Sequence, residues 1–579
     1  EITMTTPTMK PLCLALGLAL AGPAAAVQLD FSGSNIYMKF LDGNQRKEAG
    51  GSIDTASGGD QGQFSELELR IKATISPQVE AGARIQSRSS AAYWSEFGFQ
   101  GEDDSATSFT HKKFMKLRGA YVQLTPGYSW LNTALIGSSD WGMFDPFTVG
   151  KMRYIDRDNL NGVYLKGPLA KGSWEAAWVS MAEYLGPEFS AGDLEANDGT
   201  FIVQVKQPVG PVKLTGILQR TSDQERDPAD VDIWDGQATD ARMKNTVFAL
   251  KAEGSLMDGL DASGAFYRSS YDTNKQLADW SNLLGNDYDD NALLINVDWS
   301  QTPIDGFSVR FQHFNIGAGY VSATAARRES DVLLTEGSEA AWYGWGDSTW
   351  LGGRANDMLQ VPITIRDNDY TDFDETGAES SIGWKGNTLL FGYEVADTPM
   401  SLELSRIDYN QNWQNWGGDQ DIFNVISWGG PTGPGFREDQ DRKTDILVFK
   451  ANHQFPVAGG LDLGFKYKWV KDKDKRDKTT SADNYEAEDS GFSVTVGNQL
   501  HNDLYGSISY GLYNRDISLG SNDYDNSKSI WSLRLSYNLS GFEAGLLTQY
   551  VDGDGDPTMS GTKIDFSQYR TKAFLKAIF

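Results

Sequence analysis

Cysteine, histidine and long apolar runs are scarce in this chain of 579 residues. Cys13 is the single cysteine, and the four histidines lie at scattered positions without the spacing of metal ligands. The sequence therefore predicts no disulfide, no metal site and no cofactor. No segment offers the ~18 consecutive apolar residues that a membrane-spanning helix needs. Motifs of acyl transfer and phosphate binding are also missing, so we do not expect an enzyme.

Residues 1–26 carry the features of an export signal. From Met9 the sequence MKPLCLALGLALAGPAAAVQ has one Lys, an apolar run of about ten residues and a small-residue box ending at Ala26. This arrangement is typical of a cleaved secretory signal and is too short to span a bilayer. A buried N-terminal helix is the alternative. We expect residues 1–8 to be an upstream extension, and the first strand to follow Ala26 without a plug domain before it.

Apolar and polar residues alternate strictly on both sides of a break near residue 77. In FSELELRIKATIS, from Phe64, Leu and Ile take one parity and charged residues the other, and the alternation resumes at Val79. A period of two indicates a β-strand with two unlike faces, and Ser-Pro-Gln at 76–78 supplies a tight turn. The same pattern recurs along the chain, most clearly at 212–219, 307–313, 461–470, 531–539 and 569–579.

Short turns alternate with long polar stretches such as KDKDKRDKTTSADNYEAEDS. Hairpins with two different ends are typical of a transmembrane β-barrel, which closes its sheet because lipid cannot satisfy an exposed edge. We predict an all-β, antiparallel up-and-down barrel of about 22 strands over residues 27–579, with short periplasmic turns and long extracellular loops. Turns are expected at 76–78, 126–128, 208–211 and 456–460. The interval 319–380 lacks alternation and either hides a further hairpin or folds inward as a constriction.

The final stretch, YRTKAFLKAIF, places apolar residues on one parity and stops at Phe579. Together with the export signal and the hairpin array, it makes the sequence resemble Gram-negative outer-membrane porins, whose last strand ends in an aromatic residue that the barrel-assembly machinery recognises. The resemblance implies a place in the cell outer membrane, contact with lipid and lipopolysaccharide, and a water-filled channel for small hydrophilic solutes. It leaves a homo-oligomer open and implies no nucleic-acid partner.

Charge on the polar parity is predominantly basic in the clearest stretches, although the whole chain has a formal net charge of −28. Because the apolar parity of a membrane barrel faces lipid, the polar parity faces the lumen. Two interpretations stay open: mixed charges that solvate the channel and pair across strands, or a basic wall that concentrates anions, with the acidic excess in the loops. The predicted basic pore-lining residues are Arg70, Lys72, Arg84, Arg88, Arg310, Lys466, Lys468 and Arg534.

Aromatic residues gather in the long interval, in the sequence SEAAWYGWGDSTWLGG. Trp342, Trp345 and Trp350 are predicted to line the pore, because exposed rings beside polar groups suit sugars. An interfacial aromatic belt or a loop core is the alternative. We therefore expect a porin for anions or oligosaccharides. The alternative is a barrel sheath for a partner protein, such as the porin component of a porin–cytochrome conduit, and the partner would have to bring the haem.

Overall fold

The structure is a computed structural model. It describes residues 27–48, 53–55, 64–90, 115–139, 141, 144–149, 161–180, 199–222, 243–273, 288–317, 319–320, 322, 332–337, 381, 383–409, 441–456, 460–475, 484–519, 521–555 and 564–579. The predicted export signal lies outside these residues. Among them, no helix has the length and apolarity to cross a membrane.

The described residues form 24 β-strands. They are β1 (Gln28–Asp30), β2 (Asn35–Glu48), β3 (Ile53–Thr55), β4 (Phe64–Ser76), β5 (Val79–Ser90), β6 (Met115–Leu124), β7 (Thr133–Ser138), β8 (Asn161–Leu169), β9 (Gly172–Ser180), β10 (Gly199–Val209), β11 (Val212–Ser222), β12 (Met243–Met257), β13 (Leu260–Thr273), β14 (Tyr288–Trp299), β15 (Phe307–Ile316), β16 (Trp384–Val395), β17 (Thr398–Tyr409), β18 (Asp441–Phe455), β19 (Leu461–Lys475), β20 (Tyr485–His501), β21 (Leu504–Leu519), β22 (Asn522–Leu539), β23 (Phe542–Gly555) and β24 (Ile564–Ile578).

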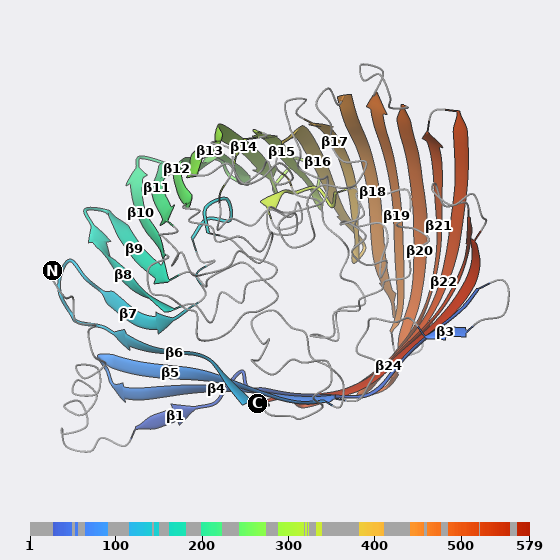
Figure 1. Cartoon of the computed structure of the whole chain (residues 1–579), viewed down its shortest axis with the longest axis horizontal. Coiled ribbons are helices and arrows are strands. Elements are labelled where there is room, and N and C mark those ends of the chain that lie inside the picture. Colours follow the sequence, from blue (N-terminus) through green and yellow to red (C-terminus); the bar gives the residue numbers. More distant parts are fainter. Residues whose placement is uncertain are drawn as a thin grey trace, which may run out of the picture.

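Of the strands in the described residues, 22 close into one antiparallel barrel (Figure 1). Each strand from β4 to β23 pairs with the next, and β2 closes the ring by pairing with both β24 and β4. The short β1 pairs with β4, and β3 adds three residues beside β2. The predicted fold and strand number are confirmed. Because β15 pairs directly with β16, no strand is inserted between them in the wall, and most of the interval 319–380 lies outside the described residues.

Alternation along the strands separates two faces, as β12 shows. Val247 and Ala249 are 0% exposed, whereas Phe248 and Leu250 between and beyond them are 47% and 50% exposed. Large exposed apolar side chains recur in register on other strands, including Phe201, Leu218, Phe266, Leu404 and Phe465. Exposure of such a face to water costs roughly 25 cal/mol of free energy per Å² of apolar surface. A closed barrel with an apolar outside is therefore the solution for a bilayer, and it matches the architecture of outer-membrane barrels.

The two ends of the barrel differ. At one end, two-residue turns join strand pairs at 77–78, 170–171, 210–211, 258–259, 396–397, 502–503 and 540–541. Ala396 and Asp397 both have positive φ, of 48° and 60°, which matches the type I′ turn that fits the twist of a hairpin. The backbone N of Phe579 donates to the Ser34 carbonyl at 2.9 Å, so the last strand ends at this turn end. All four turns predicted from the sequence connect consecutive strands here.

The largest buried apolar cluster lies on the inner side of the wall. Wall residues such as Ile202, Val247 and Phe314 belong to it, and so do residues from the connections between strands. Those connection residues are Trp141, Phe147, Val149, Tyr320 and Leu333. Figure 1 shows the cyan segment that contains residues 144–149 inside the ring of strands. Parts of two long connections therefore fold back into the lumen and cover the inner wall.

Candidate functional site in the lumen

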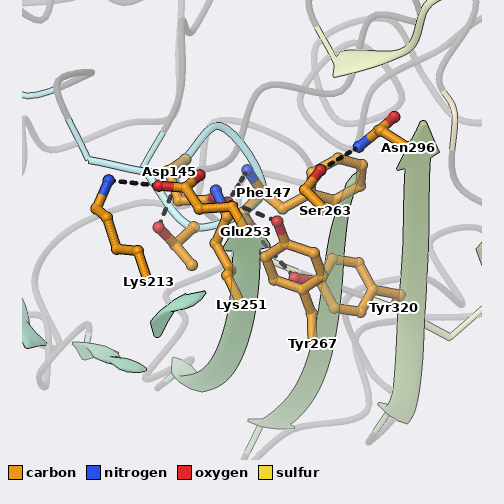
Figure 2. A network of polar contacts seen from close by, with 10 residues as sticks. Asp145, Phe147, Lys213, Lys251, Glu253, Ser263, Tyr267, Asn296 and Tyr320 are labelled. Carbon is orange, nitrogen blue, oxygen red and sulfur yellow. Dashed lines mark hydrogen bonds and ion pairs between the residues drawn. The ribbon is translucent and has the colours of Figure 1, made fainter. Parts of the chain in front are cut away.

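The 144–149 segment, from the connection between β7 and β8, is fixed to the inner wall through Asp145 (Figure 2). The Asp145 carboxylate is 2% exposed. Its Oδ2 accepts hydrogen bonds from Lys251 Nζ on β12 at 2.6 Å and from the Tyr267 hydroxyl on β13 at 3.1 Å, and its Oδ1 accepts one from the Phe147 backbone N at 2.9 Å. A buried charge needs such partners, so these contacts hold the segment in place.

Aromatic rings join this segment to the long connection between β15 and β16. Phe147 stacks on Tyr267 with centroids 5.0 Å apart and meets Tyr320 edge-on at 6.3 Å. The Tyr320 hydroxyl donates to the Phe147 carbonyl at 3.0 Å, and Ser322 Oγ donates to the Thr148 carbonyl at 3.2 Å. Burial, and after it the Asp145 carboxylate, raises the pKa of Tyr320, so its hydroxyl stays protonated and able to donate. The two connections are thus linked to each other inside the barrel.

A second piece of the long connection, the 332–337 segment, meets a row of polar side chains on the wall. Asn296 on β14 donates to Ser263 on β13 at 3.2 Å, and Gln312 on β15 donates to Asn296 at 2.8 Å. The row ends on the loop, because the Leu334 backbone N donates to Gln312 Oε1 at 2.7 Å. Amide side chains that both donate and accept make such a chain of hydrogen bonds continuous.

Glu403 on β17 holds the backbone of the same segment. The residue is 3% exposed, and its carboxylate accepts hydrogen bonds from Thr335 Oγ1 at 2.7 Å and from the Glu336 backbone N at 3.2 Å. Ser405 on the same strand donates to it at 2.7 Å. Hydrogen bonds to a carboxylate are among the stronger ones in proteins, which suits an anchoring role.

Lysines from two adjacent strands contact the next residues of the segment. Lys466 Nζ on β19 lies 2.8 Å from Glu336 Oε2, and Lys450 on β18 forms an ion pair with the same carboxylate. Lys468 donates to the Gly337 carbonyl. The 332–337 segment is therefore bound to β15, β17, β18 and β19 in addition to its own chain connections.

The predicted basic residues near the first hairpin lie on the inner face and pair with acids. Glu68 accepts from Arg70 Nε at 2.6 Å and from Arg84 Nε at 3.0 Å. Lys72 pairs with Glu80 at 2.7 Å. The side chains of Arg70 and Lys72 remain open to solvent, at 54% and 51%, whereas that of Arg84 is 22% exposed. These side chains therefore present charge to the lumen while they pair across strands.

The other predicted pore residues fall into three groups. Lys466 and Lys468 bind the 332–337 segment, as described above. Arg534 on β22 lies 4.0 Å from Glu543 on β23, and Arg310 stands opposite Asp298 of β14. The backbone of Arg88 pairs with that of Glu66, but its side chain lies outside the described residues. The predicted aromatic residues Trp342, Trp345 and Trp350 also lie outside them.

Inward acids on other strands offset the basic excess of the clearest stretches. Arg442 pairs with Asp472 at 3.0 Å and Arg515 with Asp489 at 2.5 Å, with all four side chains nearly buried. Further inward acids in the described strands include Glu175, Glu253, Glu403 and Glu543. Most of these strands lie outside the stretches from which the basic wall was predicted. The same alternation of apolar and polar residues would have placed their acids on the inner face. In the described wall, inward cations and acids therefore pair with one another.

No protein-family model matches the sequence, and no curated protein matches it. Among solved structures, the chain is similar to the siderophore receptor PirA from Acinetobacter baumannii, with a TM-score of 0.46 and 11% identity over 96% of this chain and 81% of that chain. An anion-selective porin from Comamonas acidovorans gives a TM-score of 0.27 and 11% identity over 96% and 100%. Outer-membrane expressed OmpT of Vibrio cholerae gives 0.26 and 9% over 96% and 99%. These likenesses are too distant to indicate a substrate.

Proposed function

We propose that this protein is an outer-membrane porin, a water-filled channel through which small hydrophilic solutes diffuse. The observation that carries the proposal is the closed barrel of 22 strands with an apolar outer face and a charged inner face. An apolar outside suits a bilayer, and a polar inside in a barrel of this size suits an aqueous path. The short-turn end faces the periplasm in this proposal, as is usual for such barrels.

The proposal includes a preference for anions. Arg70, Lys72 and Arg534 keep more than half of their side-chain surface exposed although each has an acid nearby. Cations that reach water inside a low-dielectric frame raise the local concentration of anionic solutes. Oligosaccharides are the second proposed class of solute. This part of the proposal rests on the predicted pore-lining residues Trp342, Trp345 and Trp350.

The inward segments favour a channel over a sheath for a partner protein. Residues 144–149 and 332–337 cover the inner wall from β12 to β19 and are held there by buried ion pairs and hydrogen bonds. A partner that filled the lumen would have to displace these segments. Asp145 would then lose Lys251 and Tyr267, and Glu403 would lose its hydrogen bonds from the 332–337 segment, which is costly for buried charges.

Reconstitution of the purified chain in planar bilayers tests the proposal. We expect stepwise single-channel currents, and in a KCl gradient a reversal potential whose sign indicates anion preference. Reversing Arg70, Arg84 and Arg310 to Glu should shift the reversal potential toward cations. A correctly folded barrel that gives no current steps would contradict the porin function and favour the sheath.

A further inference from the structure

The contact of Glu336 with the wall has the geometry of a ligand in an anion site. Lys450 and Lys466 stand directly opposite each other on β18 and β19, and both face the lumen. Like charges in this position repel and destabilise a sheet unless an anion lies between them. Glu336 supplies that anion: its Oε2 lies 2.8 Å from Lys466 Nζ, and its carboxylate also pairs with Lys450.

We propose that Lys450 and Lys466 form a binding site for the carboxylate or another small anionic group of a passing solute, and that Glu336 occupies this site as a built-in competitor. The inference rests on the proposed channel function. It adds a defined location and ligand class to a general preference for anions.

Different contacts hold the backbone of the segment and the Glu336 side chain, and this supports the assignment. The backbone of the segment is held independently of the Glu336 side chain, by Glu403 on one side and by Lys468 at the Gly337 carbonyl on the other. The Glu336 carboxylate can therefore leave the two lysines without release of the segment. When the carboxylate of a solute takes the place of Glu336, the two lysines keep an anionic partner, so no buried charge loses its partner.

Accessibility also agrees with a solute site. The Lys450 side chain is 42% exposed, and those of Lys466 and Glu336 are 15% and 20% exposed. The fully buried pairs of the same wall are different, since Arg515 and Asp489 are 1% and 4% exposed. Lys450 can thus be reached from the lumen, whereas Lys468, at 2%, only holds the segment.

Because Glu336 is tethered next to the lysines, it competes at a high effective concentration, typically in the millimolar range for a flexible link. Wild-type protein should therefore bind a free carboxylate weakly. Removal of the tethered charge should strengthen binding by roughly tenfold or more. A gain in affinity distinguishes the proposal from a purely structural ion pair, because the loss of such a pair would not create a tighter binding site.

The test is calorimetric titration of sodium citrate into the full chain in detergent, with sucrose as the uncharged probe. Glu336→Gln should bind citrate at least about tenfold more tightly than the wild type, with no change for sucrose. Addition of Lys450→Met and Lys466→Met to Glu336→Gln should abolish that gain. Glu488→Gln, which removes an exposed carboxylate at the loop end of β20, is the matched control and should behave as the wild type.

Glu336→Asp keeps the charge on a shorter side chain and should give an intermediate affinity, so it serves as a second variant if Glu336→Gln does not assemble. Unchanged affinity in both variants would overturn the site, as would a gain that survives loss of the two lysines. Bilayer recordings on the same preparations separate the two proposals. Current steps without tighter citrate binding support the porin function and reject the anion site. Absence of current in every variant rejects the porin function itself.

Discussion

Asp145 shows how a single residue can organise the interior of the barrel. One carboxylate joins its own segment, β12 and β13 through three hydrogen bonds, and Phe147 two residues later contacts Tyr320 of another connection. Burial of a carboxylate is costly in itself, and here the cost is offset by a cation, a hydroxyl and a backbone N–H. The position of the 144–149 segment therefore depends strongly on Lys251.

Replacing Lys251 by Met tests this dependence. The variant leaves the Asp145 carboxylate buried without its cation, a change that typically costs about 3–5 kcal/mol, so the segment should leave the wall. Hydrogen exchange should become faster at 144–149 and at Tyr320, while the amides of β12 and β13 remain protected.

The double variant Asp145→Asn/Lys251→Met is the control, because it removes both charges. Its loss of protection should be much smaller than that of Lys251→Met alone, since two groups in direct contact are not additive. Equal protection in the wild type and the single variant would show that the aromatic contacts hold the segment without the ion pair.

At the scale of the strand, the alternation of the sequence was enough to predict the wall. Every long alternating stretch became a strand, and the apolar parity became the outer face, because only this arrangement keeps Phe248 and Leu250 in lipid and Lys251 in the lumen. Strand ends were less well defined. For instance, β22 begins at Asn522, well before the stretch 531–539 in which alternation is clear, because polar residues continue the ladder beyond the apolar band.

Matched arginine substitutions on the two faces test the assignment of parity. Leu463→Arg on β19 puts a charge on the outer face, where it should cost roughly 2–4 kcal/mol at the bilayer midplane and lower the yield of assembled barrel. Thr495→Arg on the neighbouring β20 puts the same side chain on the inner face and should assemble normally. Heat-modifiable mobility on gels measures both yields. Similar losses in the two variants would contradict the assignment of parity, and a loss confined to Thr495→Arg would mean that the parity is reversed.

Cysteine labelling tests which end of the barrel faces outward. Gln78→Cys lies in the turn between β4 and β5, and Lys475→Cys lies at the opposite end of β19. A membrane-impermeant maleimide added to intact cells should label position 475 and leave 78 unlabelled. Permeabilised cells are the control, in which both positions should react. Labelling of position 78 in intact cells would invert the topology.

At the scale of the whole molecule, the contacts of the inward segments were beyond prediction from the sequence. Asp145 and Lys251 are 106 residues apart, and Glu336 and Lys466 are 130 apart, and neither segment has a period that marks a face. A local pattern cannot show which loop carboxylate meets which wall cation. For the interval 319–380 the sequence indicated its length and lack of alternation, and an inward fold was one of two alternatives, since long loops of this kind are usually functional or disordered.

We expect the linked segments to limit passage, and deletion of residues 325–356 tests this. A barrel of 22 strands is too wide for side chains from opposite walls to meet, so a narrow path requires chain that crosses the lumen. The deletion removes the 332–337 segment but no part of the wall, because β15 pairs directly with β16. Assembly should therefore stay intact, and single-channel conductance should rise several-fold. The triple reversal of Arg70, Arg84 and Arg310 to Glu provides the comparison, since it should change ion preference without a similar rise. Unchanged conductance after the deletion would mean that another part of the chain sets the width of the channel.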